Sequence, residues 1–252
     1  MQPVIAPMHS SPESFDVLGV PVSNVTMDSA TTLLEQWAGD DEGRFVCVRD
    51  MASLVAITED AQIRDLHAEA AMIVPDGMPL VYLGKRRGLG VQRVCGPDLF
   101  EEMIRRSPQN GLRHFFFGGK DGVAEKLAEM MRARFPGALI VGCATPPFRE
   151  MTDQELAAIH RQIEDSGADI VWVGLSSPKQ DVWMWRNYRA LSQTLIGVGA
   201  AFDFHSGEVK RAPEWMQKSG LEWAFRIAQE PRRLLRRYAV NGSKFAWRLL
   251  WE

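Results

Sequence analysis

Short apolar runs alternate along the chain with longer segments in which apolar residues recur every three or four positions. The short runs are typical of β-strands and lie at residues 44–48, 71–74, 113–117, 139–142, 169–174 and 194–198. Segments with helical spacing lie at residues 121–135, 152–166 and 178–191. Strands that alternate with helices indicate a parallel sheet covered on both faces. The pattern therefore predicts an α/β fold with a doubly wound, mostly parallel, Rossmann-like sheet.

Local signals support these helices. Thr152 is followed three residues later by Glu155, which is the spacing of a capping box. Pro178 follows Ser177 at the start of another helical segment, where proline is favoured. In such sheets ligands bind beyond the carboxyl ends of the strands, so we expect the site in the loops that follow them.

Two of these loops are rich in glycine. Residues 115–122 run from a strand through Gly118, Gly119 and Lys120 into a helix, and residues 196–203 place Gly199 and Asp203 after the last strand. Exposed backbone N–H groups and a helix dipole can hold phosphate at such a turn. A tight turn that merely begins a helix explains the same residues, so both interpretations stay open.

Polar side chains follow two further strands. Asp76 lies in a tight turn directly after an apolar strand, where a carboxylate can act as a general base or can cap the following helix. Residues 175–181 supply hydroxyls, an amine and the amide of Gln180, which suit hydrogen bonds to a sugar or phosphate. Lys179 in this segment could equally be solvated.

The last part of the chain is basic and carries tryptophan, although the whole chain has a formal net charge of −3. Between residues 226 and 248 one carboxylate, Glu230, accompanies a cluster of cations, which indicates an anionic partner. Interleaved apolar residues fit a helix on a lipid interface or over a phosphate-bearing ligand, and equally an amphipathic helix packed on its own core. We predict a catalytic core over residues 1–206 and a helical basic appendage over residues 207–252.

Composition and the absence of certain motifs argue against several classes of function. The chain has 252 residues, 46% of them apolar, with no apolar run of the roughly 18–20 residues that span a membrane. Residues 1–11 do not resemble a signal peptide, which predicts a cytoplasmic location, and Cys47, Cys95 and Cys143 look like small buried residues. Metal-binding motifs are not evident, and Asp203 with His205 lacks further ligands, so we expect metal-independent chemistry without a cofactor. Confinement of the cations to one tail disfavours nucleic acid.

Six ordered motifs resemble one family, the WecG/TagA/CpsF glycosyltransferases of bacterial surface polysaccharide synthesis. The motifs are VPDGMPLV at residues 74–81, RVCGPDL at 93–99, FFFGGKDGVAEK at 115–126, VGLSSPKQD at 173–181, GVGAAFDFHSGEVKRAPEWM at 197–216 and GLEWAFRIAQEPRRLLRRY at 220–238. The resemblance covers nearly the whole chain after Phe15.

The resemblance implies transfer of a sugar from a UDP-sugar to a polyprenyl-diphosphate-linked saccharide, with inversion, at the inner face of the cytoplasmic membrane. Asp76 matches the proposed catalytic base of the family, Arg93 an arginine near the pocket, and Gln180 a polar contact. In the family the appendage closes over the site and contributes arginines, which can grip a diphosphate. The matching positions are Arg226, Arg233 and Arg236. An anionic membrane surface is the implied third partner.

One segment departs from the family pattern. Many members carry Thr-x-Asn near the end of the first core strand, where this chain has Val48, Arg49 and Asp50. Arg49 and Asp50 could be donor contacts of this branch or an ion pair in a loop. The departure motivates an alternative, a non-catalytic nucleotide-sugar or lipid-binding adaptor of a polysaccharide assembly complex. A nicotinamide-dependent oxidoreductase is a weaker alternative because the full dinucleotide fingerprint is missing. A homo-oligomer is compatible with the sequence.

Overall fold

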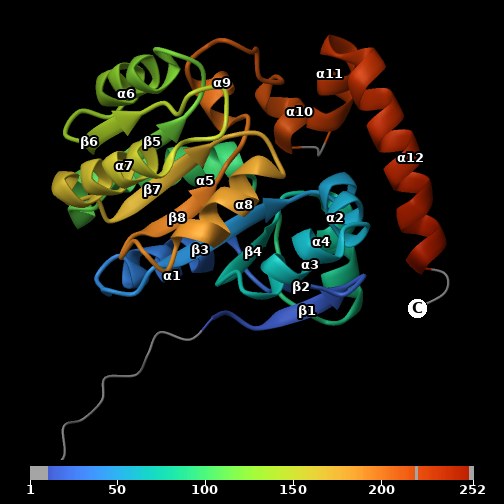
Figure 1. Cartoon of the computed structure of the whole chain (residues 1–252). Helices are drawn as coiled ribbons and strands as arrows, with labels where there is room; N and C mark the ends of the chain where they lie inside the picture. Colours follow the sequence, from blue (N-terminus) through green and yellow to red (C-terminus); the bar gives the residue numbers. More distant parts are fainter. Residues whose placement is uncertain (1–10, 219–220, 250–252) are drawn as a thin grey trace, which may run out of the picture.

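The computed structural model describes residues 11–218 and 221–249, and a six-stranded parallel sheet forms its centre (Figure 1). The strand order is β4-β3-β8-β7-β5-β6. The bounds are Arg44–Arg49 for β3, Met72–Pro75 for β4, Arg113–Gly118 for β5, Leu139–Ala144 for β6, Ile170–Gly174 for β7 and Thr194–Gly197 for β8. Each predicted strand is present, and the predicted doubly wound parallel sheet is confirmed.

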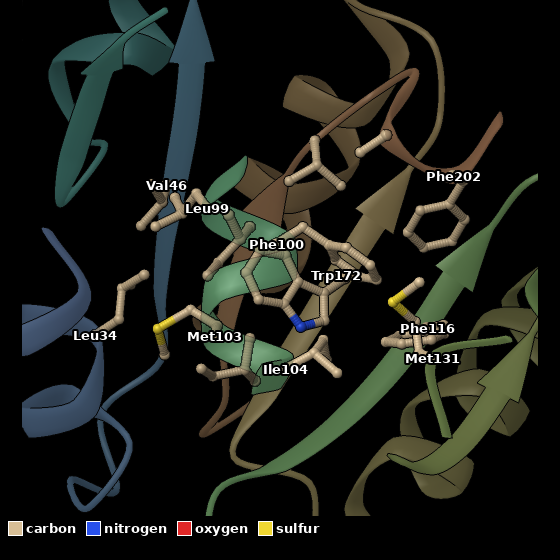
Figure 2. Packing of buried hydrophobic residues seen from close by; sticks show 14 of the residues in the cluster. Leu34, Val46, Leu99, Phe100, Met103, Ile104, Phe116, Met131, Trp172 and Phe202 are labelled. Carbon is tan, nitrogen blue, oxygen red and sulfur yellow. The ribbon is translucent and has the colours of Figure 1, made fainter. Parts of the chain in front are cut away.

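Alternating side chains of the strands feed two separate hydrophobic cores, one on each face of the sheet. In β5, Phe116 packs into the first core, whereas Phe115 and Phe117 pack into the second. Figure 2 shows the first core, where Trp172 of β7 lies edge-on to Phe100 with ring centroids 5.0 Å apart. The period of two along a strand places successive side chains on opposite faces, so an unbroken apolar run is the signature of a strand buried on both sides.

Helices cover both cores. The first core is covered by α1 (Met27–Trp37), α5 (Gly96–Asn110), α6 (Val123–Arg134) and the short α9 (Ala201–His205). The second is covered by α2 (Met51–Thr58), α3 (Ala61–Ala68), α4 (Met78–Arg86), α7 (Asp153–Ser166) and α8 (Lys179–Asn187). The capping box predicted at Thr152 and Glu155 is confirmed. Helix α8 ends at Asn187, before the predicted residue 191, because Ala190 N–H turns back to the carbonyl of Asn187.

An antiparallel hairpin near the N-terminus was not predicted. Strands β1 (Ser14–Val17) and β2 (Val20–Ser23) are joined by Leu18 and Gly19, both with positive φ. Asp16 Oδ1 accepts a hydrogen bond from the Gly19 N–H at 3.1 Å, which stabilises the turn. Strands of four residues give too short a pattern to be distinguished from an irregular segment.

The C-terminal segment forms α10 (Glu214–Lys218), α11 (Glu222–Gln229) and α12 (Pro231–Leu249). Helix α12 packs along α2, where Asn241 Nδ2 donates to Ala52 O at 3.0 Å and Lys244 pairs with Glu59 at 2.6 Å (Figure 1). Phe245 is buried in the second core, so this amphipathic helix does pack on its own protein. The division of the chain after residue 206 stays a prediction.

The outward side of α12 presents exposed apolar side chains, Leu235, Val240 and Trp247. Leu250 and Trp251, which also carry the apolar pattern, lie outside the described residues. Over the part of the chain that the structure describes, no helix combines the length and the apolarity needed to cross a bilayer.

Candidate active site

The sheet has a topological switch point between β3 and β8. The helix that follows β3 is α2, which covers the second core, whereas α9 follows β8 and covers the first. A crevice beyond the carboxyl ends of two such strands is where open α/β sheets bind ligands. Helix α5 begins above this edge, since a Cβ on Gly96 would lie 3.5 Å from Val48 Cγ1 and 3.7 Å from Val198 O.

Asp76 lies at this edge, directly after β4. Its backbone N–H donates to Arg49 O at 2.8 Å, which extends the pairing of β3 with β4 by one residue. The N-cap of α4 is Gly77, and no side chain caps this helix. The alternative that Asp76 caps α4 is therefore wrong, and its carboxylate is available for other contacts.

Arg93 connects Asp76 with the appendage. Its Nε donates to the backbone O of Asp76 at 2.7 Å, and its Nη2 lies 3.4 Å from Asp76 Oδ1. The same Nη2 lies 2.9 Å from Oε2 of Glu222 in α11. The structure therefore brings together the two residues predicted near the pocket, and adds a glutamate that was not predicted.

The surroundings of Asp76 raise its pKa to about 6. Loss of hydration is the main cause; the Arg93 charge opposes it, and the negative charges of Asp50 and Glu222 add to it. A carboxylate with a pKa near the working pH is suited to accept a proton, because it is both ionised and basic enough.

Glu222 is held from both sides. Its side chain is only 9% exposed, and its second oxygen accepts from Arg211 Nε at 3.2 Å. Arg211 also pairs with Asp98, at the start of α5, at 2.5 Å. An alternating row of charges thus runs from Asp76 to Asp98 through the base of the appendage. Sequence reasoning missed Glu222 because a glutamate at the start of a helix normally indicates a favourable dipole contact in solvent.

Asp50 contacts the appendage as well. It caps α2 by accepting from Ser53 N–H at 2.6 Å, and Arg237 of α12 lies 3.3 Å from the same carboxylate oxygen. Burial raises the pKa of the neighbouring Tyr238, and the charge of Asp50 raises it further. Arg237 and Tyr238 were not predicted as site residues.

The predicted appendage arginines differ in their placement. Arg226 lies over the ring of Phe204, next to Asp203, with its guanidinium carbon 5.5 Å from the ring centroid. Arg236 is exposed on α12, whereas its neighbour Arg237 reaches Asp50. The side chain of Arg233 lies outside the described residues.

Arg49 forms a buried cluster beneath the sheet edge. Its guanidinium pairs with Asp181 of α8, and its Nε donates to His67 Nε2 at 3.0 Å. Arg49 and Asp50 therefore each form an ion pair, but with partners far along the chain rather than with one another. Ligand atoms of Cys47, His67 and Asp181 lie within 4.8 Å of one another. Since a guanidinium already contacts the imidazole and the carboxylate, this group is a buried polar cluster and not a metal site.

The glycine turn after β5 is packed tightly against β7. A Cβ on Gly118 would lie 2.7 Å from the backbone of Gly174, and the Gly119 N–H already donates to Gly174 O at 3.0 Å. Close approach of two strand ends thus explains Gly118, whereas Gly119 has a φ of 79° and a Cβ there would lie 3.0 Å from Val123 Cβ of α6. Lys120 is exposed at the same edge, where its charge partly opposes the rise in the pKa of Asp203 that burial causes.

The turn after β8 is held from behind by α8. Gly199 has a φ of 52°, and its N–H donates to Gln180 Oε1 at 3.1 Å. Gln180 is itself buried, and a Cβ on Gly197 would approach its Nε2 to 2.9 Å. The structure therefore places Gln180 and Gly199 together, with Gln180 as the support of the loop. A direct contact of Gln180 with a ligand stays a prediction.

Fold and site together define the class: an α/β protein with a site at the carboxyl edge of a parallel sheet, where a carboxylate meets an arginine-bearing helical appendage. The model of the WecG/TagA/CpsF glycosyl transferase family matches residues 15–252. Because this match covers nearly the whole chain, the protein belongs to that family. Membership gives it a glycosyltransferase role in surface polysaccharide synthesis and implies a nucleotide-sugar donor and a saccharide acceptor.

Proposed function

We propose that the protein is an inverting glycosyltransferase that moves a sugar from a UDP-sugar to a polyprenyl-diphosphate-linked saccharide. The transferred sugar is a hexose or an N-acetylhexosamine. The observation that carries this proposal is the Asp76 carboxylate, which has a raised pKa and lies beside Arg93 at the carboxyl edge of the sheet. Inverting transfer needs one base on the acceptor side, and this carboxylate has the required basicity.

In the proposed reaction, Asp76 takes the proton of an acceptor hydroxyl while that oxygen forms its bond to the anomeric carbon. The bond between the anomeric carbon and the diphosphate breaks, and UDP leaves with the bonding electrons. Asp76 later releases the proton to solvent. Arg226, Arg233 and Arg236 of the appendage supply positive charge to the leaving diphosphate, in place of a metal ion.

The nucleotide binds, in this proposal, along the ends of β5, β7 and β8. Gly118, Gly119 and Gly199 keep this part of the edge free of side chains, and Lys120 and Asp203 border it. Gln180 contributes by holding the Gly199 turn. The acceptor then approaches from the side of β4, where Asp76 lies.

We propose that the appendage also rests on the inner face of the cell membrane. Exposed Leu235, Val240 and Trp247 share α12 with its arginines, and such a combination favours the interface of an anionic bilayer. A peripheral position there would place the site next to the lipid-linked acceptor. The protein would act from the cytoplasm.

The test is release of UDP from a panel of UDP-sugars, with and without polyprenyl-diphosphate-saccharide acceptors in anionic vesicles. We expect acceptor-dependent release by the wild type and a fall of about 10²–10⁴-fold in Asp76→Asn, because the variant cannot take the proton. Donor binding, measured by calorimetry, should persist in the variant.

Asp165→Asn, in an exposed position of α7, is the matched control and should release UDP like the wild type. Near-wild-type release by Asp76→Asn would refute its role as the base. Donor binding by the wild type without release on any acceptor would instead favour the adaptor alternative.

A further inference from the structure

We propose that Glu222 is a positioning residue that keeps Arg93 from pairing fully with Asp76, so that docking of α11 on the core prepares Asp76 to accept a proton. The catalytic consequence rests on the proposed function, since it takes Asp76 as the base. The contact itself does not, and it can be tested without turnover.

The geometry of Arg93 is that of a shared cation. Its Nε is anchored on the backbone O of Asp76 at 2.7 Å, which fixes one edge of the guanidinium next to the aspartate. Its Nη2 nevertheless lies closer to Glu222 Oε2, at 2.9 Å, than to Asp76 Oδ1, at 3.4 Å. A contact of 3.4 Å is at the weak end of hydrogen bonding, whereas 2.9 Å is close to the optimum. Arg93 is therefore committed to Glu222 more than to Asp76.

The burial of Glu222 makes this arrangement depend on the appendage. A buried carboxylate is costly unless its charge is paired and its oxygens are hydrogen-bonded. Glu222 meets this condition only where α11 lies against the core, with one oxygen on Arg93 and the other on Arg211. Arg93 also reaches the backbone O of Gln217 with Nη1 at 3.4 Å, a second contact to the appendage. Docking of α11 on the core and the orientation of the Arg93 guanidinium are therefore coupled.

Removal of Glu222 makes the surroundings of Asp76 less negative. The groups that face Asp76 are Arg93, the Cys95 thiol, Asp50 of α2, Glu222 of α11 and Tyr238 of α12. Without Glu222 one negative charge is lost, and Arg93 becomes free to close on Asp76. Both changes favour the ionised carboxylate and make it a weaker base.

The experiment is a ¹³C NMR titration of the Asp76 carboxyl carbon in the full-length protein, with its signal assigned by its loss in Asp76→Asn. In Glu222→Gln we expect the titration midpoint to fall from about 6 toward the ordinary aspartate value of about 4. The acid limb of the pH–rate profile should move down with it. Glu222→Asp keeps the charge, so its midpoint should lie between those of the wild type and Glu222→Gln.

Glu59→Gln is the matched control, because it removes a carboxylate that holds α12 through Lys244 but does not face Asp76. Its Asp76 midpoint should equal that of the wild type. An unchanged or higher midpoint in Glu222→Gln, or an equal fall in Glu59→Gln, would overturn the proposal. If the wild type transfers no sugar, the proposed function fails, whereas the NMR midpoints still decide the role of Glu222. If Glu222→Gln does not fold, a midpoint in Glu222→Asp below that of the wild type supports the proposal, and an unchanged one overturns it.

Discussion

Arg49 of β3 pairs with Asp181 of α8, and Arg93 pairs with Asp76 at the end of the neighbouring strand β4. The side chains of the first pair are 2% and 0% exposed, those of the second 20% and 28%. Asp181 accepts a further hydrogen bond from Ser177 Oγ at 2.8 Å. Arg93, in contrast, divides one nitrogen between two carboxylates.

The comparison shows that burial and the completeness of pairing give two arginine–aspartate pairs different electrostatic properties. Burial is the largest influence on the Arg49 guanidinium and disfavours its charge, but the charge and hydrogen bond of Asp181, together with Cys47 and Asp50, outweigh burial and raise the pKa of Arg49. The Arg49 guanidinium therefore stays charged beside Asp181. Asp76 receives only part of one arginine and loses hydration, so its pKa rises to about 6 and its proton can be exchanged. Incomplete pairing with arginine, rather than pairing itself, distinguishes the aspartate that we propose as the base.

The largest expected effect is on stability, from Arg49→Met. The substitution leaves Asp181 buried without its cation, and breaking such a pair costs about 3–5 kcal/mol. Urea unfolding should show this loss. Arg93→Met should cost less, because Asp76 is partly exposed and can become protonated, and Glu222 keeps its pair with Arg211.

The double variant Arg49→Met/Asp181→Leu sharpens this comparison. When both charges of a buried pair give way to apolar side chains of similar size, the loss is often small. We expect the double variant to recover most of the stability that Arg49→Met loses. A double variant that is no more stable than the single one would show that His67 and Ser177 need the pair for their own contacts.

A smaller effect is expected from Asp76→Asn on the pH dependence of stability. Asp76 titrates near 6 in the folded protein and near 4 in the unfolded chain, so the folded state binds more protons between these values. The free energy of unfolding therefore falls as pH rises from about 4 to about 6 and stays lower above that range. In Asp76→Asn this fall in the free energy of unfolding should be absent. We expect the fall to be about 1–2 kcal/mol, since Asp76 keeps some contact with water.

Urea unfolding at pH 4.5 and pH 7.5 measures this difference. At each pH the free energy of unfolding of the wild type is subtracted from that of Asp76→Asn. This difference should be more positive at pH 7.5 than at pH 4.5. An equal difference at both values would mean that Asp76 titrates alike in the folded and unfolded states. Asp181→Asn provides the contrast, because losing the charge that pairs with Arg49 should destabilise the protein at both values.

The sheet could be predicted from the sequence because its signal is local. Unbroken apolar runs such as 115–117 are typical of strands buried on two faces, and the helix-length segments between them favoured a parallel sheet, whose strands place their following loops at one edge. The family motifs then indicated Asp76 and Arg93, which do lie together. The hairpin of β1 and β2 was missed, because its strands are too short to show a period.

The partners of the charged residues could not be predicted in this way. Glu222 is 129 positions from Arg93, and Arg237 is 187 positions from Asp50, so no spacing along the chain relates them. Which arginine of α12 faces the core depends on the orientation of the helix about its own axis, and burial of Phe245 sets this orientation. Arg236 was predicted from the family motif, and its contact with the diphosphate stays a prediction; Arg237, which the motif did not indicate, reaches the Asp50 carboxylate.

The smallest expected effect tests a third aspartate–arginine pair, Asp50 with Arg237, in which the arginine side chain is 39% exposed. Arg237→Gln should cost about 0.5 kcal/mol in urea unfolding, the usual range for an exposed ion pair. The substitution should also remove the positive charge that lies next to the negative charge of Asp50. Because that charge already adds to the pKa of Asp76, the NMR midpoint of Asp76 should rise slightly.

Lys244→Gln breaks another ion pair that joins α12 to the end of α2, at Glu59, and is the control for this prediction. Its cost in stability should be similar, but the midpoint of Asp76 should not move, since Glu59 does not face Asp76. A rise in both variants would indicate that loosening of α12 alone changes the hydration of Asp76. A rise confined to Arg237→Gln would show that the charge of Asp50 tunes the pKa of Asp76, the proposed base.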